Sequence, residues 1–117
     1  MDLDTLRLTC LKLPGVLEDI KWGNDLCFLI GGKMFCVCGL SPPLKVSLKV
    51  NDDEFEDRCS RPGIVPAPYL ARYKWILVEN TGLFSKNEWN NLIENSYRLV
   101  KSRLSSRTLK ALGLENK

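Results

Sequence analysis

Two apolar runs separated by paired glycines restrict the fold of this chain more than any other feature. Residues 26–30 (LCFLI) and 33–38 (KMFCVC) flank Gly31 and Gly32. Glycine reaches the positive φ angles that a two-residue primed turn requires, so the pattern predicts a β-hairpin. Apolar side chains occupy both odd and even positions of the two runs. Such runs are typical of central strands that are covered on both faces.

Three further segments have the pattern of strands. Segment 44–50 alternates strictly between apolar and polar residues, which indicates one buried and one solvent-facing side. Its polar positions, which are expected to face water, are Lys45, Ser47 and Lys49. Residues 16–22 alternate imperfectly, and residues 75–79 form a short apolar strand. Together with the hairpin, these segments predict an antiparallel sheet of about five strands.

Helical signals occur at the beginning, middle and end of the chain. Residues 4–13 carry apolar side chains at helical spacing, with Asp2 or Asp4 as a cap and Pro14-Gly15 as the stop. Asn51 and Glu54 have the spacing of a capping box and predict a short acidic helix.

Ser85 and Glu88 form a second capping box, before the longest helix. The apolar stripe of this helix is expected to lie on the sheet. It comprises Trp89, Leu92, Ile93, Ser96, Tyr97, Val100 and Leu104.

Residues 61–69 (RPGIVPAPY) are too rich in proline for a regular element and are expected to form an extended loop. The chain contains no internal repeat and no linker long enough to separate domains. The sequence therefore predicts a single α+β domain over residues 1–117. Its expected architecture is a two-layer sandwich, in which the antiparallel sheet packs against about three helices.

Five cysteines and no histidine limit the chemistry available to the chain. Because they lie in apolar stretches and lack dense spacing, the cysteines are expected to be reduced packing residues. Cys36 and Cys38 are one residue closer than a zinc knuckle requires, so neither a metal nor a cofactor is expected. The first residues, MDLD, lack the charged and apolar regions of a signal peptide, which predicts a cytoplasmic protein without a membrane segment.

Several motifs, in order along the chain, resemble the MmcQ/YjbR family of small bacterial domains. The resemblance spans residues 3–110. The motifs are residues 13–23 (LPGVLEDIKWG), 31–35 (GGKMF), 46–50 (VSLKV), 61–75 (RPGIVPAPYLARYKW) and 96–100 (SYRLV). The resemblance implies an antiparallel sheet with helices against it, similar to CyaY-like and secretion-chaperone-like architectures. It also implies a double-wing mode of DNA binding. That implication rests on the fold and not on any identified binding residue.

One departure from the family pattern limits what can be transferred. Some members carry a histidine ahead of the tryptophan equivalent to Trp75, whereas this chain has Tyr73-Lys74 at that point. Any role of such a histidine does not carry over to this chain.

The sequence offers no catalytic constellation. Glu18 and Asp19 are adjacent on a predicted strand and therefore point to opposite faces. Gly31-Gly32-Lys33 lacks the spacing of a phosphate-binding loop and lies in a hairpin. The chain is thus not expected to be an enzyme.

Basic residues interleaved with aromatic ones suit contacts to phosphates and stacking on bases. The candidate nucleic-acid-binding residues are Lys45, Lys49, Arg61, Tyr69, Arg72, Tyr73 and Lys74. Residues 98–117 add six basic residues against Glu115 alone. This basic end can attract phosphates, or it can simply complement a helix C-terminus.

Two alternatives remain beside this hypothesis of a non-catalytic DNA-binding domain. In the first alternative, the aromatic residues Trp22, Tyr69 and Trp75 belong to the core or anchor loops, and the lysines only keep one face of the sheet in contact with solvent. A second alternative is protein–protein interaction, in which the sheet edge or the proline-rich loop docks a partner peptide or a second copy of the chain.

Overall fold

The computed structural model describes residues 1–115 and has a six-stranded, fully antiparallel sheet. The strands lie in the order β1-β2-β3-β4-β6-β5. Their bounds are β1 Leu17–Lys21, β2 Asp25–Ile30, β3 Lys33–Gly39, β4 Val46–Lys49, β5 Ile64–Pro66 and β6 Trp75–Val78. The helices are α1 Leu3–Leu11, α2 Phe55–Cys59, α3 Lys86–Lys101 and α4 Ser106–Ala111, with 3-10 turns η1 Ala71–Tyr73 and η2 Thr81–Leu83. The α+β architecture predicted from the sequence is therefore confirmed.

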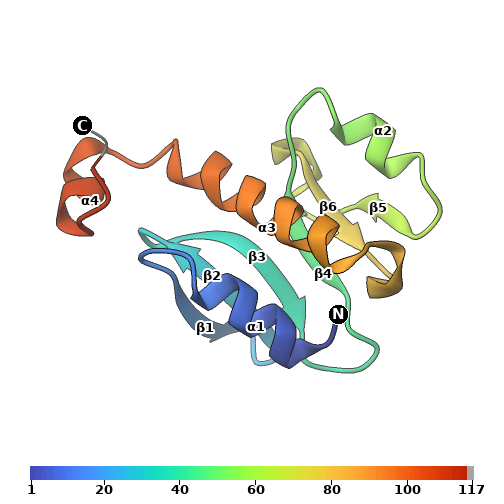
Figure 1. Cartoon of the computed structure of the whole chain (residues 1–117). Helices are drawn as coiled ribbons and strands as arrows, with labels where there is room; N and C mark the ends of the chain where they lie inside the picture. Colours follow the sequence, from blue (N-terminus) through green and yellow to red (C-terminus); the bar gives the residue numbers. More distant parts are fainter. Residues whose placement is uncertain (116–117) are drawn as a thin grey trace.

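The helices α1 and α3 cover one face of the sheet, with α3 lying across β3 and β4 (Figure 1). The opposite face has no helix on it among the described residues, and Met34, Val37 and Leu77 are only half-buried there. The hairpin strands are central in the sheet, as predicted. The expectation that both of their faces are covered is wrong for Met34 and Val37, although Cys27 of β2 is fully buried on the same side. We call the two sides the helix face and the open face.

A β-bulge in β3 explains why the apolar pattern of the hairpin suggested two buried faces. The register shifts between Phe28 and Leu29, which makes Phe35 an extra residue in β3. Both Phe35 and the next residue, Cys36, are fully buried. Because a bulge interrupts the two-residue alternation, two consecutive apolar side chains can enter the same core.

A buried hydroxyl from α3 fills the gap that opens between β3 and β4. The last residue pair of this ladder is Cys36 with Leu48. Beyond it, the Ser96 hydroxyl donates to the Phe35 carbonyl at 2.6 Å and accepts from the Lys49 amide at 3.0 Å. This serine satisfies two buried backbone groups that the divergence of the strands would otherwise leave unpaired.

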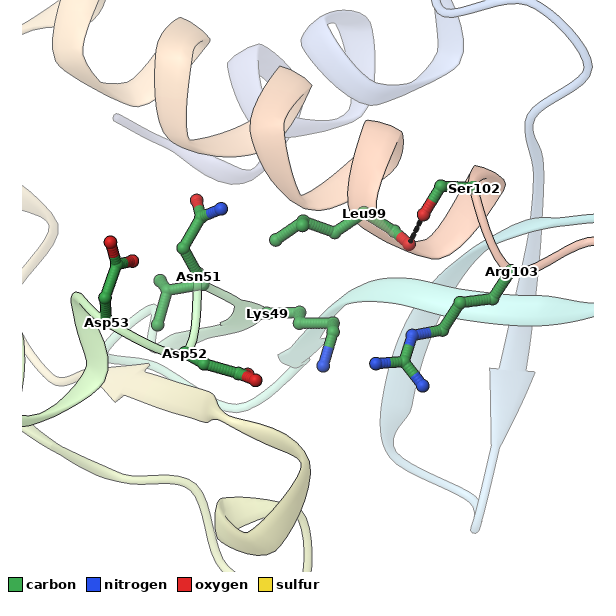
Figure 2. A pocket seen from close by; sticks show the side chains of 8 residues that line it. Lys49, Asn51, Asp52, Asp53, Leu99, Ser102 and Arg103 are labelled. Atoms are coloured by element: carbon green, nitrogen blue, oxygen red, sulfur yellow. Dashed lines mark hydrogen bonds between the residues drawn. The ribbon is translucent and has the colours of Figure 1, made fainter.

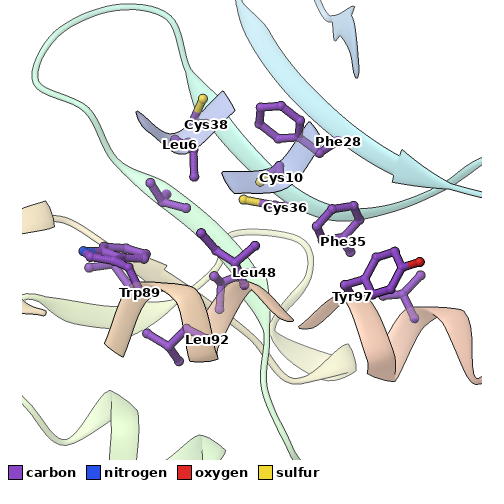
Figure 3. Close-up of a cluster of buried hydrophobic side chains, with 14 of the residues drawn as sticks. Leu6, Cys10, Phe28, Phe35, Cys36, Cys38, Leu48, Trp89, Leu92 and Tyr97 are labelled. Carbon is purple, nitrogen blue, oxygen red and sulfur yellow. The ribbon is translucent and has the colours of Figure 1, made fainter. Parts of the chain in front are cut away.

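The apolar stripe of α3 packs on the sheet as predicted, and its capping box at Ser85 is present. Figure 3 shows Tyr97 beside Phe35, where the rings meet edge to face at 5.5 Å between centroids. The Tyr97 hydroxyl donates to the Pro14 carbonyl at 2.6 Å, and Trp89 Nε1 donates to the Thr81 carbonyl at 2.9 Å. The first bond fixes α3 to a segment 83 residues earlier in the chain, and the second fixes it to the neighbouring turn η2.

Two local predictions are wrong. The segment 61–69 contains a short strand, β5, at the edge of the sheet. Its prolines are compatible with a strand there, because Pro66 is the last residue of an edge strand and its missing N–H leaves no ladder hydrogen bond unmade. The predicted capping box at Asn51 is absent: the N-cap of α2 is Glu54, without a side-chain cap bond. Asn51 accepts instead from the Asn95 amide at 2.7 Å, so its side chain ties the loop to α3.

Four of the five cysteines are buried, as a packing role predicts, and Cys59 is half-buried. No helix among residues 1–115 has the length and apolar composition needed to cross a membrane.

Candidate functional site

Lys49, at the end of β4, is buried, although its position in the alternating strand predicts a side chain in water. Only 7% of it is exposed, and its Nζ donates to the backbone carbonyl of Tyr73. The prediction fails because η1 folds over the end of β4 and the end of α3 approaches from the other side. Burial lowers the pKa of Lys49, and the charges of Arg103 and Lys74 lower it further, while Asp52 opposes them.

A cavity of about 360 Å³ opens beside Lys49. Figure 2 shows Lys49 and Arg103 directed toward the same space, with Asp52 at its rim. The other lining residues are Val50, Asn51, Asp53, Leu99 and Ser102. The three cations Lys49, Arg103 and Lys74 outnumber the two carboxylates of the lining, Asp52 and Asp53, so an anion beside the buried lysine would be favourable.

The turn η1 and its C-cap Lys74 carry three of the predicted residues, and the Tyr73 carbonyl accepts from the buried Lys49. The guanidinium of Arg72 lies over the Tyr73 ring at 4.7 Å and donates to the Tyr73 hydroxyl. Lys74 adopts a left-handed conformation at φ 64° and places its Nζ 5.1 Å from the centroid of the Phe55 ring. We define the η1 basic cluster as Lys49, Arg72, Lys74 and Arg103.

The remaining predicted residues lie elsewhere. Arg61 is on the surface at the end of α2, where it pairs with Asp57 at 3.2 Å. Lys45 and Tyr69 are both on the open face. The structure thus brings together Lys49, Arg72, Tyr73 and Lys74, but it separates them from the other three.

The open face carries a groove with a volume of about 810 Å³. Its floor consists of Met34, Val37, Ser47 and Leu77, and Ala67, Pro68 and Leu70 of the proline-rich segment line one side. Lys45 and Asp25 contribute its charged groups. The groove has the size and the mostly apolar lining of ordinary ligand sites.

Two exposed aromatic residues border this groove in strained conformations. Trp22 is 71% exposed at φ 54°, and Tyr69 is 98% exposed at φ 66°. Bulky residues rarely adopt positive φ, because the conformation is costly for a side chain with a Cβ. The alternative interpretation of the aromatics as buried anchors is therefore right for Trp75 and wrong for Trp22 and Tyr69.

Sequence reasoning missed the role of Arg103 in the site. Arg103 belongs to the basic C-terminal segment noted above, but only the fold places it beside Lys49, which is 54 positions earlier in the chain. The sequence gave no signal for the groove either, because its lining comes from four strands, β2, β3, β4 and β6, and from loops.

Comparisons with known proteins place the chain in a family. The family model YjbR matches residues 11–99. The crystal structure of the Deinococcus radiodurans protein DR2400, which has a DUF419 domain, is similar at a TM-score of 0.84 and 30% identity, covering 96% of this chain and 88% of that one. A Pseudomonas syringae protein is similar in fold, with a TM-score of 0.71 and 22% identity over 85% of this chain and 98% of that one. A comparison with curated proteins finds no significant match. The match to residues 11–99, in agreement with the resemblance seen in the sequence, shows that this chain belongs to the YjbR family.

Proposed function

We propose that this YjbR-family domain is a non-catalytic DNA-binding domain that holds backbone phosphates at the η1 basic cluster. The observation that carries the proposal is the electrostatic environment of Lys49. Burial lowers the pKa of Lys49 most, the charge of Arg103 lowers it further, Asp52 raises it, and Lys74 adds a smaller lowering. Cations held close together repel one another, and a bound phosphate relieves that repulsion while releasing counterions from the nucleic acid.

The proposal of a non-catalytic domain is supported by the state of the titratable groups. The neighbouring Cys10 thiol and burial raise the pKa of Cys36 well above its ordinary value, and burial raises that of Cys38 to about 11. These thiols stay protonated near neutral pH and are therefore poor nucleophiles. The pKa of Glu88 is lowered by the Ser85 amide and hydroxyl, and that of Glu18 by Arg7, which are structural contacts.

Phosphate contacts of this kind give affinity without sequence preference. Four cations predict a slope of about −3 to −4 in a plot of log affinity against log salt concentration. Fluorescence anisotropy with a labelled duplex, at low salt and then at rising salt, measures both quantities. If no binding appears at about 100 μM protein, which is the weak end of ordinary non-specific affinity, the proposal is wrong.

A pair of matched variants tests the location of the contact. Arg103→Glu reverses a charge inside the cluster, and we expect it to weaken DNA binding by at least about tenfold at low salt. Arg61→Glu reverses the same charge just after α2, away from the cluster, and should leave the affinity within about threefold. Because both side chains are exposed, the thermal melts of the two variants should remain close to that of the parent chain.

The open-face groove favours a second candidate function, the binding of an extended apolar segment of a partner protein. The observation behind it is the exposed pair Trp22 and Tyr69. Both residues have a strained backbone, and their side chains are too exposed for packing within the chain to compensate for that strain. Trp75 and Trp89 are buried, so a ligand in the groove would change mainly the fluorescence of Trp22. Titration with an apolar peptide should shift that fluorescence in the parent chain and not in Trp22→Phe.

A further inference from the structure

The two edges of the sheet differ in how well they are protected. The edge strand β5 has three residues and ends at a proline, which is a common way to prevent pairing with another chain. The other edge, β1, has five residues and no proline. Its Leu17 and Ile20 side chains are 71% and 57% exposed. An edge strand of this kind presents unpaired N–H and C=O groups together with apolar side chains.

The charges of β1 are arranged so that the strand can pair with itself. Asp19 and Lys21 lie on either side of Ile20 and share one face of the sheet, because alternate residues of a strand face the same way. In an antiparallel pair around a twofold axis through Ile20, Ile20 lies opposite the partner's Ile20. Asp19 then lies opposite the partner's Lys21, and Lys21 lies opposite the partner's Asp19. A shift that centres the pair on Asp19 would place two carboxylates face to face, so charge selects the register.

A hollow beside this edge supplies apolar surface on the helix face. It has a volume of about 520 Å³ and lies between α1 and β1. The Arg7 guanidinium donates to the Glu18 carboxylate at 2.7 and 2.9 Å and holds the two elements side by side. The apolar lining residues are Leu3, Ile20, Leu26 and Leu40. Leu11 of α1, one turn after Arg7 on the same side of the helix, is also exposed.

We propose that two copies of this chain associate through β1, with Ile20 on the twofold axis, to form one continuous antiparallel sheet. The ion pairs between Asp19 and Lys21 form on the open face, and the Ile20 side chains and the hollows meet on the helix face. This assembly uses a surface on a different part of the fold from the η1 basic cluster and goes beyond the proposed DNA binding. Since one short strand from each copy forms the centre of the contact, the dimer is weak and reversible, with a dissociation constant of about 10–100 μM.

Sedimentation velocity without nucleic acid, over about 5–500 μM protein, tests this proposal directly, because such a weak dimer forms within that range. The parent chain should rise from the monomer mass toward twice that mass. Asp19→Lys should remain monomeric, because two lysines then face two lysines across the axis. Lys21→Asp should also remain monomeric, because aspartates face aspartates.

An equimolar mixture of these two variants makes the test specific. Lysines of one variant then face aspartates of the other, so the mixture should recover the dimer mass that neither variant shows alone. Glu56→Lys, an equal charge change on the exposed surface of α2, should dimerise like the parent chain. The proposal is overturned if the parent chain is monomeric throughout, if either single variant dimerises like the parent chain, or if the mixture is no heavier than its components.

Discussion

The helix face and the open face belong to the same strands, yet the helix face is covered far more completely, since Cys27 and Trp75 are the buried exceptions on the open face. On the helix face, Phe28, Leu48 and Ile76 are fully buried under α1 and α3. On the open face, their strand neighbours Leu29, Ser47 and Leu77 are only half-buried. The contrast separates two tasks: one face supplies most of the hydrophobic free energy of folding, and the other leaves apolar surface available for a ligand.

The largest expected effect of a substitution is on the helix face. Leu92→Ala removes a buried side chain of α3, and we expect it to cost about 2–4 kcal/mol of unfolding free energy. Leu77→Ala is the matched change on the open face and should cost about 1 kcal/mol, because that side chain already contacts solvent. Chemical denaturation measures both values. Equal losses in the two variants would mean that the open face is packed as tightly as the helix face.

The hydroxyl of Ser96 gives the next largest effect. Ser96→Ala leaves the Phe35 carbonyl and the Lys49 amide without their shared partner, at a cost of about 1–3 kcal/mol. Hydrogen exchange should also show faster exchange of the Lys49 amide in the variant. A loss below about 0.5 kcal/mol, typical of a surface change, would contradict the role assigned to this serine.

Periodicity predicted the helix face well and the open face poorly, for physical reasons. The stripe of α3 from Trp89 to Val100 follows from a 3.6-residue repeat, since an amphipathic helix needs one buried side. The burial of Lys49 depends on η1 and α3, which no local pattern around Lys49 encodes. The bulge at Phe35 likewise arises from the pairing of two strands and left only an irregular apolar pattern in the sequence.

Of the candidate site, the sequence supplied the residue types but not their grouping. Lys49, Arg72, Tyr73 and Lys74 were predicted and lie together, because β6 returns η1 to the end of β4. Arg61 was predicted with them but lies just after α2, where it forms an ion pair with Asp57. Distances across a sheet are set by strand order, and the order β4-β6-β5 was not predicted.

On the open face, we expect Tyr69→Asn to stabilise the chain. Asparagine tolerates a positive φ better than tyrosine, and the exposed Tyr69 ring loses little packing. The expected gain is about 0.5–1 kcal/mol, measured by thermal melting. Pro68→Ala, next to it and also exposed, is a control that leaves Tyr69 in place and should bring no such gain. A clear loss of stability in Tyr69→Asn would show that the aromatic ring supports the fold rather than a ligand.

The smallest effect concerns pH and the contact between α1 and β1. The Arg7 guanidinium holds the pKa of Glu18 below its usual value. The stability from this pair is therefore fully present above the ordinary glutamate pKa and is lost as the pH falls through the lowered value. Glu18→Gln should remove this part of the acid dependence and leave the melt near neutral pH only slightly changed. An unchanged acid dependence in Glu18→Gln would contradict the assignment.

The most direct test of the central claim compares the salt dependence of DNA binding in two variants, one on each surface. The double variant Lys74→Gln/Arg103→Gln removes two cations of the η1 basic cluster, and Lys45→Gln removes the exposed lysine of the open-face groove. We expect the double variant to lower the magnitude of the salt slope by about 1.8, which is about 0.9 for each lost phosphate contact, while Lys45→Gln leaves it unchanged. If the slope instead changes in Lys45→Gln and not in the double variant, the phosphates lie over the open face and the assignment of the η1 basic cluster is wrong.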